Sequence, residues 1–233
     1  MTTSFNPGER AELIRQRLPD EGLFAGYDWR ISPEPFRISP ELLKEFHFLG
    51  RVFLQFYRAV NLLYRQSLAG KQPGWIADVL ESGKPAELIE LQRSPAFKSD
   101  VPRVIRPDIL LTEGGGVTVS ELDSVPGGIG LTAWLNQTYS DLGISGVVAG
   151  EGAMLDGFAR IFGKSERVHI VISEEAGTYR PEMRWLSEQL GPKFAVRSPD
   201  FLDFQKGDAV YRFFELFDLA NVPAAKTIFA KAA

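Results

Sequence analysis

The chain has 233 residues, of which 44% are apolar and 24% charged, as in ordinary folded proteins that bury a core. Its formal net charge of −4 and the lack of any block of like charge give no reason to expect nucleic acid or a membrane surface as a partner. The absence of cysteine excludes a disulfide framework, a thiolate metal site and a cysteine nucleophile.

The first residues lack the basic-then-apolar pattern of a signal peptide. The sequence also contains no apolar run of the roughly 18 residues that a membrane-spanning helix needs. We therefore expect a cytoplasmic location and no membrane partner.

Residues 1–99 are predicted to form a helical N-terminal segment. A short helix over residues 8–18 precedes an extended stretch broken by prolines. Ser39 and Pro40 have the residue types of a helix start, an N-cap hydroxyl followed by proline at the first helical position. This helix is expected to run to Leu68 and, because its apolar stripe is wide, to be mostly buried. Two shorter helices are expected over residues 75–81 and 85–93.

Residues 100–163 are predicted to form a β-hairpin followed by two helices. Strands over residues 104–112 and 117–122 flank the turn residues Glu113-Gly-Gly-Gly116. Simple alternation places Val117, Val119 and Glu121 on one face of the second strand. The helices are expected over residues 130–142 and 151–162.

Residues 164–233 have the alternating pattern of strands and helices that is typical of an α/β segment. Strands are expected over residues 168–173, 194–197 and 209–213, with helices over residues 178–190 and from residue 223 onward. Strand–helix–strand spacing of this kind favours a parallel, Rossmann-like sheet. The expected fold class is therefore α/β or α+β, in the three consecutive segments 1–99, 100–163 and 164–233.

Three acidic residues, Asp108, Glu121 and Asp123, are candidates for one site. In a hairpin that turns near Gly115, Asp108 falls opposite the other two, and Arg106 shares its face. Carboxylates this close repel one another unless a cation lies among them, and oxygen ligands without His or Cys suit Mg²⁺. Arg106 suits phosphate or developing negative charge. The alternative is a solvated face on which Arg106 pairs with an acid.

The run R-x-D, a turn, and then E-x-D-x-x-P-G resembles the metal-binding strands of ATP-grasp ligases. It is made by Arg106, Asp108, Glu121, Asp123, Pro126 and Gly127. The resemblance implies that the three acids hold Mg²⁺ against the phosphates of the co-substrate ATP. Asp123 stands where Asn is usual in the family, and it is still an oxygen ligand.

The order of the elements is similar to that of the circularly permuted ATP-grasp family, related to glutathionylspermidine synthetase and to carboxylate–amine ligases. The metal-binding strands precede the Rossmann-like stretch, and the resemblance covers roughly residues 101–233. It implies a further subdomain, the ATP lid, after that stretch. Because the sequence ends at residue 233 without one, we expect an N-terminal portion or a natural short form that is weakly active or inactive alone.

The glycines after the second strand allow two interpretations. Gly128 to Ala133 form a G-x-G-x-x-A string that imitates a dinucleotide fingerprint, although the preceding strand ends in Glu-Leu-Asp rather than an apolar run. Alternatively, the free N–H groups of the helix N-terminus bind a substrate carboxylate or phosphate. The candidate residues for that second role are Ser124, Gly127, Gly128 and Gly130.

Other candidates carry less weight. Glu174, Glu175, Thr178 and Arg180 follow a strand of the parallel sheet, where loops often bind ligand, but a plain solvated loop is the favoured interpretation. His169 lies within a buried-type strand and no G-x-S-x-G elbow occurs, so Ser-His-Asp catalysis is not supported.

The expected function is an ATP- and Mg²⁺-dependent carboxylate–amine ligase that works through an acyl phosphate. Its partners would be a small-molecule or peptide carboxylate and an amine, whose identities the sequence leaves open together with the oligomeric state. A non-catalytic fragment or binding module of the same fold is the alternative, and a dinucleotide-binding oxidoreductase is the lesser one.

Overall fold

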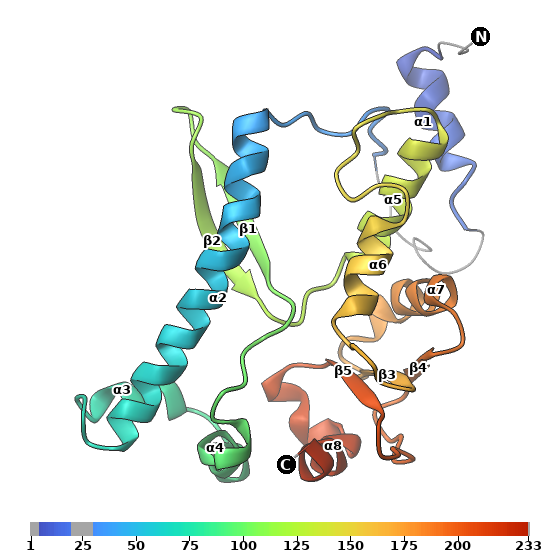
Figure 1. Cartoon of the computed structure of the whole chain (residues 1–233). Coiled ribbons are helices and arrows are strands. Elements are labelled where there is room, and N and C mark those ends of the chain that lie inside the picture. Colours follow the sequence, from blue (N-terminus) through green and yellow to red (C-terminus); the bar gives the residue numbers. More distant parts are fainter. Residues whose placement is uncertain (1–4, 20–29, 233) are drawn as a thin grey trace. The chain divides into compact units, whose positions relative to one another are not determined.

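The computed structural model describes residues 5–19 and 30–232, and Figure 1 shows its elements in chain order. Helices and strands are mixed, with one antiparallel hairpin and one parallel sheet. The chain divides into two compact units, Met1–Arg37 with Val125–Ile228 and Ile38–Ser124 with Phe229–Ala233. Each unit joins pieces that are distant in sequence, whereas the expected division into three consecutive segments stays a prediction.

The second unit begins with the long helix α2 (Pro40–Leu68). The hydroxyl of Ser39 accepts a hydrogen bond from the backbone N–H of Leu42 at 3.1 Å, and Pro40 occupies the first turn, so the predicted start and end are confirmed. Helices α3 (Trp75–Glu81) and α4 (Ala86–Arg93) and the short 3-10 turn η1 (Pro95–Phe97) follow.

A carboxylate on α3 ties these three helices together. Arg93 of α4 donates two hydrogen bonds to Glu81, at 2.7 and 2.6 Å, and the hydroxyl of Tyr64 on α2 donates a third at 2.6 Å. Arg65 of α2 also donates to the backbone carbonyls of Gln92 and Arg93. Because the charged donor and acceptor meet in a bidentate pair, this junction fixes the C-terminal part of α2.

The prediction that α2 is mostly buried is wrong. Only Phe53, Tyr64 and Ser67 of this helix are buried. A helix of this length extends about 44 Å at 1.5 Å per residue. The two short helices that contact its C-terminal part are too small to cover it, so much of its apolar stripe remains exposed.

The predicted hairpin is confirmed, and it consists of β1 (Arg106–Leu111) and β2 (Val117–Asp123) in antiparallel pairing. Gly115 turns the chain with φ of 78°, a conformation that favours glycine. The register passes from Asp108↔Glu121 to Ile109↔Val119, so Ser120 is an extra residue that forms a bulge. Val119 and Glu121 therefore lie on opposite faces, which corrects the face assignment made from simple alternation.

The first unit contains a three-stranded parallel sheet, as predicted. Strands β3 (Val168–Ile172), β4 (Phe194–Arg197) and β5 (Ala209–Phe213) pair in the order β4-β3-β5. The turn η2 (Gly177–Tyr179) and helix α7 (Arg180–Leu190) connect β3 to β4. All five residues of the central strand β3 are buried, which explains its uninterrupted apolar character.

Two helices precede this sheet in the chain, α5 (Ile129–Asp141) and α6 (Ala153–Arg160), close to the expected ranges. Phe158 of α6 and Phe162 just after it pack edge-to-face against Tyr211 of β5, with ring centroids 5.1 and 6.1 Å away. Phe162 also meets Phe194 of β4 at 5.6 Å. These rings form an aromatic core on one side of the sheet.

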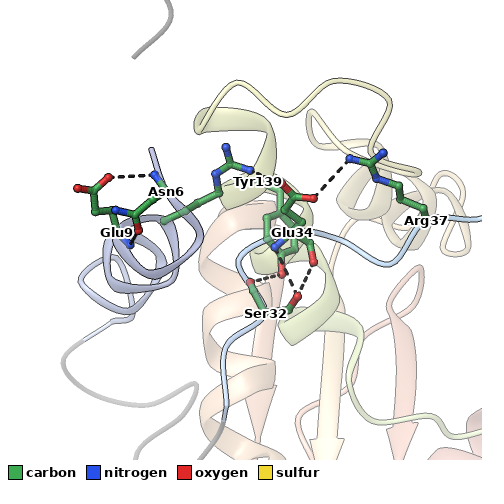
Figure 2. A network of polar contacts seen from close by, with 7 residues as sticks. Asn6, Glu9, Ser32, Glu34, Arg37 and Tyr139 are labelled. Carbon is green, nitrogen blue, oxygen red and sulfur yellow. Dashed lines mark hydrogen bonds and ion pairs between the residues drawn. The ribbon is translucent and has the colours of Figure 1, made fainter. Parts of the chain in front are cut away.

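Helix α1 (Pro7–Arg15) belongs to the same unit although it lies far from the sheet in sequence. Its Ile14 is fully buried in a cluster with Trp134 and Tyr139 of α5. The Tyr139 hydroxyl donates to the backbone carbonyl of Ser32 at 3.0 Å (Figure 2). Glu34 pairs with Arg10 at 2.9 Å. These contacts anchor the N-terminal segment on α5.

The last elements are the 3-10 segment η3 (Leu216–Asn221) and helix α8 (Ala224–Ala232). Throughout residues 5–19 and 30–232, no helix combines the length and the apolar character that crossing a bilayer requires.

Candidate functional site

The hairpin brings four of the predicted site residues to one face. Arg106 lies opposite Asp123 and Asp108 lies opposite Glu121 in the antiparallel register. Opposite residues of an antiparallel pair share a face, and so do residues two apart on one strand. The bulge at Ser120 leaves this arrangement intact, because it lies between these pairs and the turn. The expected juxtaposition of the three acids with the arginine is therefore present.

Arg106 neutralises part of this acidic face. Its Nε lies 3.1 Å from Oδ1 of Asp108 and its Nη2 lies 3.4 Å from Oδ2 of Asp123. The side chains of Arg106 and Asp108 are about half exposed, so these ion pairs contribute little to stability. Their effect is local, because a guanidinium between two carboxylates reduces the negative electrostatic potential that would otherwise attract a metal ion.

The three carboxylates are not gathered as a metal centre. Among the residues that the structure describes, no group of three or more His, Cys, Asp or Glu side chains is placed to hold a metal ion. The oxygen-only donor set of Asp108, Glu121 and Asp123 has the chemistry that Mg²⁺ prefers, and Arg106 pairs with two of these three carboxylates. Magnesium ligation by these residues stays a prediction.

A tyrosine of α2 belongs to the surroundings of this face. Burial raises the pKa of Tyr57, and the negative charge of Asp123 raises it further. The phenol therefore remains a neutral hydrogen-bond donor at neutral pH. Tyr57 was not among the predicted site residues, and nothing near it in sequence signalled an acidic neighbour.

The glycines that follow β2 have packing and conformational roles. A Cβ on Gly127 would stand 2.3 Å from Cε1 of Tyr179, and a Cβ on Gly130 would stand 2.7 Å from Cγ of Glu182. Gly128 is the N-cap of α5 and has φ of 86°. Each position thus favours glycine without any ligand, whereas Ser124 is exposed at the end of β2.

The N-terminus of α5 is already occupied by a side chain, the buried carboxyl group of Glu182 on α7. The backbone N–H of Gly130 donates to its Oε1 at 2.8 Å. Burial raises the pKa of Glu182, while hydrogen bonds from the N–H groups of Gly130, Leu131 and Gly128 act in the opposite direction. The position that a substrate phosphate or carboxylate would take is therefore occupied by a side chain that the sequence did not indicate.

The loops after β3 and β5 meet at the carboxyl ends of the parallel strands. Ser173 donates to the buried carboxylate of Asp218 at 3.1 Å, and Asn221 donates to Glu175 at 2.6 Å. Arg180 pairs with Glu174 at 3.5 Å. The polar groups of these side chains thus find partners among themselves. Ser173 and Asp218 are buried, and neither was predicted as a site residue.

His169 is a structural residue of the sheet. Arg197 donates to its Nδ1 at 3.1 Å, so its Nε2 carries the proton and donates to Asp208 at 2.9 Å. Arg167 makes a bidentate pair with the same carboxylate, at 2.9 and 2.7 Å. Burial lowers the pKa of His169, and Arg167 holds the pKa of Asp208 far below its usual range.

Comparisons with known proteins add no assignment to this geometry. No protein-family model, no curated protein and no solved structure matches the chain.

Proposed function

We propose that this chain provides the acidic half-site of an ATP- and Mg²⁺-dependent carboxylate–amine ligase of the circularly permuted ATP-grasp type. One observation carries the proposal. The hairpin register sets Arg106 opposite Asp123 and Asp108 opposite Glu121, so that three carboxylates and a guanidinium share a face. This is the set of residues that the ATP-grasp motif requires on two adjacent strands.

The fold supports the same assignment at a coarser level. The parallel strand order β4-β3-β5, with a helical crossover between β3 and β4, is compatible with the α/β segment that the proposal requires. The acidic hairpin precedes this sheet in the chain, as the permuted order requires. The proposal therefore rests on both the residues of the face and their position in the chain.

The reaction is an acyl transfer driven by ATP. A substrate carboxylate oxygen attacks the γ-phosphorus, ADP leaves, and an acyl phosphate forms. An amine then attacks the acyl carbon, loses a proton and expels phosphate. Mg²⁺ would neutralise phosphate charge, with Asp108, Glu121 and Asp123 as its protein ligands. Arg106 exchanges its carboxylate partners for the transferring phosphoryl group, whose charge it stabilises.

The test compares Glu121→Gln and Asp108→Asn with Glu113→Gln, an exposed carboxylate of the hairpin turn that serves as the matched control. We expect Mg²⁺-dependent ATP binding, followed by calorimetry, and any phosphate release to disappear in the first two variants and to persist in the control. Unchanged binding or turnover in Glu121→Gln would overturn the assignment.

A non-catalytic binding module of the same fold is the second candidate. Two contacts favour it, because Arg106 already compensates the acidic face and Glu182 already fills the N-terminus of α5. This candidate predicts that the wild-type chain neither binds Mg-ATP at submillimolar concentration nor releases phosphate.

The dinucleotide-binding alternative has less support. Gly127 and Gly130 are glycines because Tyr179 and Glu182 approach them, and the helix N-terminus where a pyrophosphate would bind holds a carboxylate. It predicts NAD binding that Gly128→Val abolishes.

A further inference from the structure

Helix α2 carries a row of cations at intervals of seven residues, Lys44, Arg51, Arg58 and Arg65. The first three are exposed, and no hydrogen bond or ion pair joins their side chains to any residue of the described ranges. Arg65 instead donates to backbone carbonyls near α4. We call Lys44, Arg51 and Arg58 the basic row. Arg51 and Arg58 lack the acidic neighbours three or four residues away that often accompany exposed cations on a helix, whereas Lys44 has Glu41 three residues before it.

An apolar seam runs beside the basic row. Its residues follow the alternating spacing of four and three that characterises a coiled-coil face, and they are Phe48, Val52, Gln55, Ala59 and Leu62, all apolar except Gln55. Phe48 is 57% exposed and Leu62 is 58% exposed. In heptad terms the seam occupies positions a and d, and the basic row occupies position g.

The local composition separates this surface from the rest of the chain. Residues 46–77 contain no Asp or Glu, although the whole protein has 30 acidic residues and a net charge of −4. Arg51 and Arg58 therefore have no acidic partner within this stretch of the chain. A surface that combines exposed apolar side chains with such cations is suited to a partner that is apolar and acidic.

We propose that the seam and the basic row of α2 form a docking surface for an acidic amphipathic helix of another protein. Cations seven residues apart are spaced by about 10.5 Å along the helix axis, which equals the spacing of acidic residues at one heptad position of a partner helix. The partner's apolar stripe covers Phe48 and Leu62, and its acidic row faces Arg51 and Arg58.

Charge disfavours a second copy of this chain as the occupant. In an antiparallel pair the g positions of the two helices face each other, so Arg51 and Arg58 would meet cations. In a parallel pair the g positions face the e positions, which are Leu49, Phe56 and Leu63 and carry no negative charge. Neither arrangement compensates the basic row, whereas an acidic helix compensates it in both orientations.

The experiment uses a synthetic helical peptide of about four heptads, with Leu at positions a and d and Glu at positions e and g, so that it suits either orientation. Its counterpart has Lys in place of Glu. Binding to the full chain is followed by fluorescence anisotropy. We expect the acidic peptide to bind, the basic one not to bind, and the affinity of the acidic peptide to fall with rising salt.

Two sets of variants locate the binding surface. Arg51→Glu with Arg58→Glu should weaken binding of the acidic peptide by about ten-fold or more, because attraction becomes repulsion at two sites. Lys71→Glu with Lys206→Glu changes the net charge equally at exposed residues outside the row and should leave binding unchanged. Phe48→Ser with Leu62→Ser should abolish binding, while circular dichroism confirms that every variant retains its helical content.

Several outcomes would overturn the proposal. They are failure of the acidic peptide to bind, equal binding of the basic peptide, and unchanged binding after reversal of Arg51 and Arg58. Self-association of the chain that depends on Phe48 and Leu62 would assign the seam to a second copy. Binding to phosphatidylserine vesicles or to a single-stranded oligonucleotide in place of the peptide would assign it to a lipid surface or to nucleic acid.

Discussion

The carboxylate of Glu182 accepts a hydrogen bond from the backbone N–H of Gly130, 2.8 Å away and 52 residues earlier in the chain. This contact joins the first turn of α5 to the first turn of α7. It places a buried carboxyl group where helix N–H groups have no intrahelical acceptor, so the carboxyl oxygen satisfies a donor of the first turn.

We predict that Glu182→Ala lowers the free energy of unfolding by about 2 kcal/mol, because it leaves buried N–H groups without an acceptor. Glu188→Ala changes an exposed carboxylate on the same helix and should cost less than about 0.5 kcal/mol. Urea unfolding measures both. Equal effects of the two substitutions would show that the Glu182 contact contributes nothing specific.

The same residue gives a pH dependence of defined sign. Because the pKa of Glu182 is raised by burial, the folded state holds the proton more tightly than the unfolded state. Its contribution to stability is present below the ordinary pKa of about 4.5 and is lost as the pH rises through the folded-state pKa. Relative to Glu182→Gln, the wild-type protein should therefore become more stable as the pH falls from 7 toward 4.5. Parallel stability curves for the two proteins would contradict this expectation.

Gly130→Ala tests whether the lack of a side chain at this position is needed for the close approach of Glu182. The added Cβ would meet Cγ and the backbone oxygen of Glu182 at 2.7 and 2.9 Å, so we expect a loss of about 2 kcal/mol in the free energy of unfolding. Gly157→Ala is the control, since a Cβ there meets nothing within 4 Å inside α6. That substitution should stabilise the protein by about 0.5–1 kcal/mol, as measured by thermal or urea unfolding.

The sheet depends on Asp208 as the common acceptor of His169 and Arg167. Asp208→Asn should lower the free energy of unfolding by about 3 kcal/mol, because it leaves two buried or half-buried donors without a charged acceptor. Asp203→Asn removes an exposed carboxylate nearby and should cost less than about 0.5 kcal/mol. Denaturant unfolding at pH 7 compares them, and a neutral Asp208→Asn would contradict the structural role given to His169.

Arg106 and Mg²⁺ compete for the same carboxylates if the proposed function is correct. Arg106→Ala should then raise the affinity for Mg²⁺ alone and lower the affinity for Mg-ATP, because the arginine shields the acids before it binds phosphate. Lys98→Ala, at an exposed cation of the same unit, is the control. Calorimetric titrations with MgCl₂ and with Mg-ATP give both affinities. A parallel change in the two would exclude competition.

Features encoded by neighbouring residues were predictable from the sequence. The start of α2 follows from Ser39 and Pro40, and the hairpin turn follows from its glycines. The parallel sheet follows from short apolar strands separated by a helix. Each signal needs only a few adjacent residues, because capping, turn geometry and strand burial are local consequences of residue type.

Features that depend on distant partners were not predictable. The bulge at Ser120 changes the face of Val119 without any glycine to mark it. Glu182 reaches Gly130 from another helix, and Asp208 reaches His169 from a loop. The exposure of α2 depends on how much of the chain folds against it, and no residue of the helix encodes that amount. Hydrophobic periodicity identifies an apolar stripe but not the element that covers it.

The burial of Ile14 against Trp134 and Tyr139 imposes a delay on the growing chain. Trp134 is 120 residues further along the sequence than Ile14. At ribosomal rates of roughly 5–20 residues per second, α1 waits about ten seconds for its packing partner. During synthesis the whole of α2 and the hairpin emerge in that interval, so most of the second unit is made before α1 can contact α5. Until α5 is made, the side chain of Ile14, which is fully buried in the folded protein, lacks the apolar partners that this helix supplies.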